Sequence, residues 1–158
     1  MKRSLALLSA VVLAATALAG LAAVATSATS KPATVKTHSS ALGKIVADGK
    51  SRTVYLFAKD KHGKSTCSGA CAQEWPPMLT KGTPKAGAGI KATLLGTTRR
   101  ADGTTQVTYN KHPLYTFTAD RGKPGSTAGN GVDAFGAKWY AVTTNGTAKP
   151  GGSGSSGY

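Results

Sequence analysis

The stretch Tyr55-Leu56-Phe57-Ala58-Lys59-Asp60 returns sixty residues later as Tyr115-Thr116-Phe117-Thr118-Ala119-Asp120. Both copies read Tyr-x-Phe-x-x-Asp. Self-similarity at a fixed spacing is the signature of repeated structural units. The sequence therefore predicts a tandem repeat, with one unit at about 41–80 and the other at about 91–144.

The likeness between the two copies extends beyond the motif itself. Ala47-Asp48-Gly49 precedes the first copy, and Ala101-Asp102-Gly103 precedes the second. A tryptophan follows each copy, Trp75 in the first unit and Trp139 in the second. These flanking matches favour a duplicated unit over a chance recurrence of six residues.

Each motif is typical of a strand that ends in a turn. Successive side chains of a strand point to opposite faces, so Tyr55 and Phe57 share a face, and the second copy repeats this arrangement. Asp60 and Asp120 fall just after the strands, where an aspartate carboxylate accepts hydrogen bonds from backbone N–H groups further along. Two interpretations follow: the motif residues, with Trp75 and Trp139, build the core, or tyrosine and aspartate line a binding site.

The rest of the pattern predicts a mainly β fold. Apolar runs at 42–47 and 53–58 flank one Asp-Gly pair, and runs at 93–100 and 105–109 flank another, as in β-hairpins. Further strands are expected at 114–118 and 138–143. Short strands with regular turn signals predict a single domain of two β-units, arranged as a sandwich or barrel, with one short helix near Cys67–Glu74.

The two ends of the chain differ in composition from its middle. Residues 1–28, with Lys2, Arg3 and an apolar run rich in alanine, are predicted to be a secretory signal peptide. Residues 29–40 are interpreted as a flexible linker, residues 41–145 as the folded domain, and residues 146–158 as a disordered Gly/Ser tail. No cysteine lies near the expected cleavage site, so the mature protein is expected to be secreted without a lipid anchor or a membrane span.

The charge balance points to anionic partners. The chain has 20 Lys+Arg against 6 Asp+Glu, a net charge of +14. Removing Lys2 and Arg3 from the 20 basic residues leaves 18 against 6 acidic ones, a net charge of +12. Such an excess attracts polyanions, and a secreted chain meets anionic cell-wall or surface polymers first. The lysines are scattered, so no specific nucleic-acid site is expected, and the oligomeric state stays open.

The only cysteines, Cys67 and Cys71, leave two interpretations. In an oxidising compartment they are expected to pair, and residues four apart on a helical turn are close enough to do so. The alternative is a redox or soft-metal site, with His62 as a third ligand for copper.

Enzyme signatures are missing from the sequence. It has no Gly-x-Ser-x-Gly elbow, phosphate-binding loop or dinucleotide fingerprint, so no cofactor and no catalytic residue is assigned. Asp60 and Asp120 would form a glycosidase-like carboxylate pair only if the fold brought them together. The sequence favours a non-enzymatic module.

The motifs together resemble a known family. The duplicated Tyr-x-Phe-x-x-Asp, the segments at 67–77 and 131–139, and His112-Pro113-Leu114-Tyr115 are similar to a bacterial family of secreted repeats and predicted lipoproteins with a Tyr-x-aromatic-x-x-Asp motif. The resemblance covers about residues 42–142. It implies secretion or envelope attachment and a tandem repeat, and it assigns no biochemical function.

Overall fold

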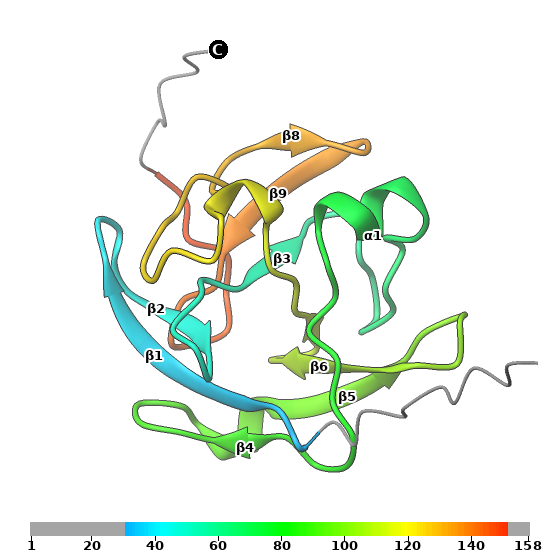
Figure 1. Cartoon of the computed structure of the whole chain (residues 1–158), viewed down its shortest axis with the longest axis horizontal. Coiled ribbons are helices and arrows are strands. Elements are labelled where there is room, and N and C mark those ends of the chain that lie inside the picture. The colour runs from blue at the N-terminus through cyan, green and yellow to red at the C-terminus, as the bar shows by residue number, and fades with distance from the viewer. Residues whose placement is uncertain (1–30, 152–158) are drawn as a thin grey trace, which may run out of the picture.

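Short strands joined by turns make up most of the structure, a computed structural model that describes residues 31–151 (Figure 1). The strands pair in three small sheets, in the orders β2-β1-β4, β3-β9-β8 and β5-β6-β7. The elements are β1 (Thr34–Ser40), β2 (Gly43–Asp48), β3 (Tyr55–Phe57), α1 (Ala70–Glu74), β4 (Lys85–Ala86), η1 (Ala92–Leu94), β5 (Leu95–Arg99), β6 (Thr105–Tyr109), β7 (His112–Pro113), η2 (Thr118–Asp120), β8 (Asp133–Ala134) and β9 (Ala137–Ala141). The predicted mainly β fold with two repeat units and one short helix is confirmed.

Strand β3 separates two hydrophobic clusters. Val54 and Leu56 pack into the first cluster, which also holds Val35, Val46, Met78, Val107, Tyr109, Leu114 and Val142. Tyr55 and Phe57 point the other way, into a cluster with Ile45, Cys67, Cys71, Trp75, Tyr115, Trp139 and Ala141. The alternation along this short strand therefore buries both of its faces, because each face meets a separate core.

The two motif copies meet backbone to backbone. The Tyr55 N–H donates to the Tyr115 carbonyl at 2.8 Å, and the Tyr115 N–H donates to the Tyr55 carbonyl at 3.0 Å. This antiparallel pair places the tyrosines directly opposite one another at the junction of the repeats.

The second copy forms less strand than the sequence predicts. Pairing covers β7 and Tyr115, which forms bridges to both Tyr55 and Pro77, while residues 118–120 form the 3₁₀ turn η2. The Thr116 N–H still pairs with the Pro76 carbonyl at 2.9 Å, beside the bridge from Tyr115 to Pro77. The expected strand at 114–118 ends early because the chain turns into η2 from Thr118 on.

The prediction of a flexible linker at 29–40 is wrong for residues 34–40. Residues Thr34–Ser40 form β1, which pairs with β2 over six positions, and Val35 is fully buried. The amino-acid composition does not reveal this strand, because Val35 is its only buried apolar residue. The threonines beside it favour strands but also occur in linkers. The folded domain therefore begins before residue 41. As a consequence, β2 pairs mainly with β1, and its expected hairpin with 53–58 is reduced to one bridge, Ala47 to Thr53.

The predicted tail at 146–158 is also partly ordered. The Lys149 N–H donates to the Ala141 carbonyl at 2.8 Å, and Ala148 packs against the first cluster. These residues extend the pairing at the end of β9, so backbone hydrogen bonds hold a segment whose side chains bury little. Residues 152–158 and the predicted signal peptide at 1–28 lie outside the described residues.

The second predicted hairpin is confirmed. Strands β5 and β6 pair antiparallel from Leu95–Tyr109 to Arg99–Thr105. Between them, Asp102 accepts hydrogen bonds from the N–H and hydroxyl of Thr104, and Gly103 adopts a φ of 80°. The Asp-Gly pair predicts this hairpin correctly because it closes the connection between two successive strands.

Candidate functional site

The motif tyrosines and aspartates are exchanged between the repeats. The Tyr55 hydroxyl donates to Asp120 Oδ2 at 2.7 Å, and the Tyr115 hydroxyl donates to Asp60 Oδ2 at 2.7 Å. Each copy of the motif thus donates from its tyrosine to the other copy and accepts at its aspartate from the other copy. Because Tyr55 and Tyr115 face each other at the junction, each hydroxyl reaches the loop of the opposite repeat.

The second oxygen of each aspartate fixes the loop that follows it. Asp60 Oδ1 accepts from the N–H and the hydroxyl of Thr66, six positions on. Asp120 Oδ1 accepts from the Ser126 hydroxyl, also six positions on, and from the Ala128 N–H. The predicted turn role of the aspartates is therefore observed over a longer loop than the sequence indicated. The hydrogen-bond partners of Asp60 and Asp120 are different residues, so the two carboxylates do not share one set of donors.

Both tyrosines retain their protons under ordinary conditions. Burial raises the pKa of Tyr55, and the hydrogen bond and the negative charge of Asp120 raise it further. Burial and the charge of Asp60 likewise raise the pKa of Tyr115. A phenol beside a carboxylate in a dry site serves as a hydrogen-bond donor, since its ionisation would place two negative charges together.

The aromatic residues alternate between repeats in a continuous stack. Phe57 lies on Trp139 with centroids 4.1 Å apart, Trp139 lies on Trp75 at 4.0 Å, and Trp75 lies on Phe117 at 4.0 Å. Each tyrosine meets the tryptophan of its own repeat edge-on, Tyr55 with Trp75 and Tyr115 with Trp139. The stack thus joins the two units through four rings, and its members are buried apart from the half-buried Phe117.

The repeats differ around their tryptophans. The Trp139 Nε1–H donates to the Ala134 carbonyl at 3.2 Å, but the buried Trp75 Nε1 has no partner among the described residues. The position five residues before Trp75 is Ala70, the first residue of α1, where the second repeat has strand β8. The first repeat has a helix at this position, and Trp75 has no counterpart of the Ala134 carbonyl, so its indole N–H is an unsatisfied donor in the core.

The cysteines form the predicted disulfide. Cys67 and Cys71 are joined with their Cα atoms 5.3 Å apart, and both side chains are buried in the second cluster. Sulfur atoms in a disulfide are not thiolates, the form in which cysteine binds soft metals. His62, the suggested third ligand, is exposed, and the described residues contain no group of three or more His, Cys, Asp or Glu able to hold a metal ion.

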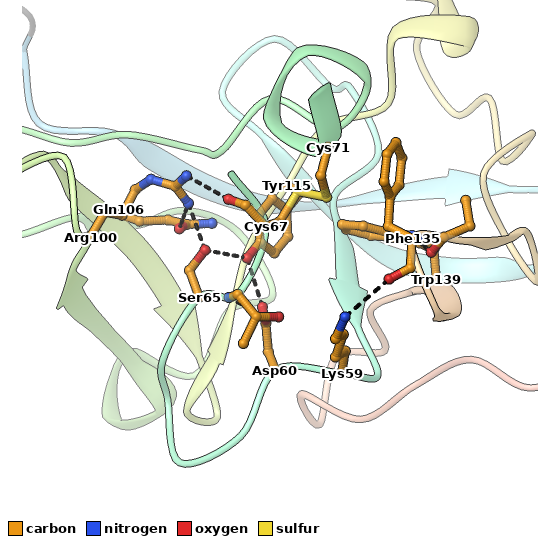
Figure 2. Close-up of a disulfide and its surroundings, with 12 residues drawn as sticks. Lys59, Asp60, Ser65, Cys67, Cys71, Arg100, Gln106, Tyr115, Phe135 and Trp139 are labelled. Carbon is orange, nitrogen blue, oxygen red and sulfur yellow. Dashed lines mark hydrogen bonds between the residues drawn. A yellow bond between two sulfur atoms is a disulfide. The ribbon is translucent and has the colours of Figure 1, made fainter. Parts of the chain in front are cut away.

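Sequence reasoning missed the arginine that ties this disulfide loop to the second repeat. Buried Arg100 donates from Nη2 to the Cys67 carbonyl, and from Nη1 to the Ser65 hydroxyl and to Gln106 Oε1, each at 2.7 Å (Figure 2). The Tyr115 hydroxyl is also 2.8 Å from Ser65 Oγ, so the network reaches the motif. Arg99-Arg100 resembles two ordinary surface charges in the sequence, and no local signal distinguishes the buried one.

His112 lies beside the Asp60 loop. It is half-buried, and desolvation lowers its pKa, with Lys61 acting in the same direction and the charge of Asp60 opposing both. It occupies the place that Arg52 holds in the first repeat, three residues before the motif tyrosine. The two repeats therefore differ chemically at equivalent positions. The lowered pKa of His112 favours its neutral form, whereas Arg52 carries a permanent positive charge.

Hollows occur at the surface where the repeats meet. A pocket of about 250 Å³ is lined by residues of both units, among them Arg52, Phe117, Asp120 and Arg121. The pocket includes one motif aspartate and the half-buried motif phenylalanine, but not Asp60. A separate pocket of about 450 Å³ lies against β5 and β6, and its side chains are uncharged.

Comparison with known proteins identifies a family. A family model described as "Secreted repeat of unknown function" matches residues 36–78 and 96–143, once for each repeat. No curated protein and no solved structure matches the chain. Among residues 31–151, no helix has both the length and the apolar character needed to cross a bilayer.

Proposed function

The chain belongs to this family of secreted repeats of unknown function, and from that premise we propose that it is a non-enzymatic extracytoplasmic module that binds anionic polymers of the cell wall or surface. The observation that carries the proposal is the excess of 20 basic over 6 acidic residues. Within residues 31–151 the two ion pairs use Arg52 and Arg100, so the lysines there have no carboxylate within salt-bridge distance. Their charge is available to a polyanion.

The hydrogen bonding of the carboxylates supports the same proposal. Asp48, Asp60 and Asp120 are buried and accept hydrogen bonds from neighbouring turns or tyrosines, so these three carboxylates lie away from the surface that a polyanion would meet. We propose that the motif residues, Trp75 and Trp139 included, hold the two units together, and that binding uses the basic exterior.

Binding to inorganic polyphosphate at increasing salt concentration tests this function. Affinity should fall steeply, because association with a polyanion releases the counterions condensed on it. An uncharged dextran serves as the control and should not bind. Affinity for polyphosphate that is unchanged between low and high salt would contradict the electrostatic mechanism.

The alternative is a redox or copper site at Cys67 and Cys71, and it requires the disulfide to open. Titration of free thiols on the purified, non-denatured protein separates the two functions. The module proposed above has no reactive thiol and takes up no copper. Two reactive thiols per chain, or one equivalent of bound copper, would favour the alternative.

A further inference from the structure

Two pockets adjoin on the face where the repeats meet. One has a volume of about 250 Å³ and the other about 390 Å³, and both are lined by Arg52, Pro76 and Thr116. The first continues to Phe117 and Arg121, and the second to Lys50 and Leu79. We call the pair the junction groove. Because they share three lining residues, the pockets adjoin, and together they reach from Lys50 and Leu79 to Phe117 and Arg121, which gives room for a chain rather than for a single small ion.

One cation of the junction groove is held in place by the fold. Arg52 donates from Nε to Asp48 Oδ2 at 2.7 Å, and its Nη2 lies 2.7 Å from the same oxygen. The Lys50 and Arg52 N–H groups both donate to Asp48 Oδ1 at 2.9 Å. The Arg52 side chain is nevertheless 42% exposed, so its remaining N–H groups are free to meet a ligand. A guanidinium positioned in advance loses less conformational freedom on binding.

The opposite rim comes from the second repeat. Arg121 follows the buried Asp120 in a left-handed conformation with φ 49°, and its N–H is held by the Thr118 carbonyl at 2.9 Å. The next residue, Gly122, lies against Arg52, since a Cβ there would be 3.9 Å from Arg52 Cδ. The backbone of this second cation is thus fixed directly after the aspartate that receives the Tyr55 hydroxyl.

Apolar side chains line the same groove as these cations. Pro76, Pro77 and Phe117 line the hollow, and Leu79, with 46% of its surface exposed, is the more exposed of the two large apolar side chains open to solvent among the described residues. Exposed apolar surface beside several cations, one of them held by Asp48, matches a chain that alternates anionic groups with C–H-rich units. The other end of the pseudo-symmetric junction lacks this combination, because His112 stands in the place of Arg52 there.

We infer that the junction groove binds a polymer of phosphodiester-linked polyol units, with the phosphates at Lys50, Arg52 and Arg121 and the polyol carbons against Pro76, Phe117 and Leu79. This inference rests on the proposed function and names its site and ligand class. Phosphate fits the guanidinium fork, which donates two parallel N–H groups to a tetrahedral anion.

The charge part of the inference is tested with poly(glycerol phosphate) oligomers as the probe. The double variant Lys50→Gln/Arg121→Gln removes two exposed cations of the groove, and Lys61→Gln/Lys64→Gln removes two from the opposite Asp loop as a matched control. The groove variant should bind about tenfold more weakly, with a salt slope lower by roughly 2. The control should weaken binding by about threefold or less, because it changes only the general field.

The polyol part is tested with Leu79→Ser and two probes of equal phosphate number. This variant should weaken binding of poly(glycerol phosphate) by about threefold, because the shorter serine side chain covers less of the polyol carbons. Binding of inorganic polyphosphate, which has no such carbons, should be unchanged. Amide chemical shifts of the labelled wild type should move at residues 49–52, 76–79 and 116–122 when poly(glycerol phosphate) is added.

The outcomes separate the site from the function. Wild-type protein that binds neither probe at low salt overturns the proposed function itself. Equally weakened binding in the two double variants, or shifts centred on residues 61–64, overturns the groove while leaving the function in place. Equal effects of Leu79→Ser on both probes overturn the polyol assignment.

Discussion

The Tyr55 hydroxyl lies 2.7 Å from Asp120 Oδ2, so the tyrosine of the first motif is bound to the aspartate of the second. The reverse bond, from Tyr115 to Asp60, has the same length. Each unit thus completes the buried polar network of the other, which makes neither repeat self-sufficient. A single unit of this chain would bury a tyrosine and an aspartate without their partners.

Double-mutant cycles will detect the exchange. Tyr55→Phe and Asp120→Asn should each cost about 1–3 kcal/mol of unfolding free energy, and their effects should be coupled by at least about 1 kcal/mol because they share one hydrogen bond. The pair Tyr55→Phe with Asp60→Asn is the matched control within one motif, and its effects should add. Urea denaturation measures all of the variants. Coupling within the motif and additivity across the repeats would contradict the structure.

The two motif phenylalanines should differ in their contribution to stability. Phe57→Ala removes a side chain that is 1% exposed and stacked on Trp139, and it should cost about 3–5 kcal/mol. Phe117→Ala should cost less, since Phe117 is half-buried and solvent can reach the space that it leaves. Thermal or urea midpoints compare the two. Equal destabilisation by the two substitutions would contradict this expectation, because it would mean that partial exposure of Phe117 does not reduce its contribution to stability.

Alkaline conditions should unfold the protein through its tyrosines. The folded pKa values of Tyr55 and Tyr115 are raised, so their stabilising effect is complete below the ordinary phenol pKa of 10.0 and is lost as the pH rises above it. The unfolded phenols release protons there while the folded ones keep theirs. Urea midpoints between about pH 9 and about pH 11 should fall steeply in the wild type and less steeply in Tyr55→Phe. Tyr140→Phe is the control variant, and it should retain the wild-type slope.

Mild acid should act through His112. Its folded pKa is lowered from the ordinary 6.5, chiefly by burial, so the stability that its neutral form provides is present above 6.5 and is lost as the pH falls. The unfolded imidazole binds a proton that the folded one resists. His112→Gln should therefore lose less stability than the wild type between about pH 7 and about pH 5. His62→Gln alters an exposed histidine and is the matched control; if it flattens the profile equally, the effect does not come from His112.

Reduction of the disulfide should have a limited effect. The loop between Cys67 and Cys71 is short, and the chain-entropy model gives about 2 kcal/mol for its closure. Dithiothreitol should lower the urea midpoint of the wild type accordingly while leaving the Cys67→Ala/Cys71→Ala variant, which has no bridge, unchanged. Complete unfolding on reduction would show that the disulfide supports the Arg100 network and the aromatic stack as well as its own loop.

Features that depend on local order are visible in the amino-acid sequence. The strand at 55–57 is recognisable from the short apolar run at 53–58, and the short helix at 70–74 because prolines follow it closely. The β5–β6 hairpin is recognisable from its Asp-Gly pair. Strand β1 was missed since Thr34–Ser40 bury one apolar side chain, and a segment held mainly by backbone pairing has no periodicity to detect. Arg100 was missed for a related reason: nothing beside it in the sequence shows that Ser65, Cys67 and Gln106 surround it.

The duplication, the mainly β fold and the aromatic core thus follow from the spacing of residue types along the chain. Three further features required the folded molecule: the bond from Tyr55 to Asp120 rather than Asp60, the alternation of the four stacked rings between repeats, and the meeting of Lys50, Arg52 and Arg121 along one groove. The physical reason is that two like motifs offer the same donors and acceptors. The choice between them depends on the antiparallel pairing of Tyr55 with Tyr115, a contact between distant segments that no local pattern encodes.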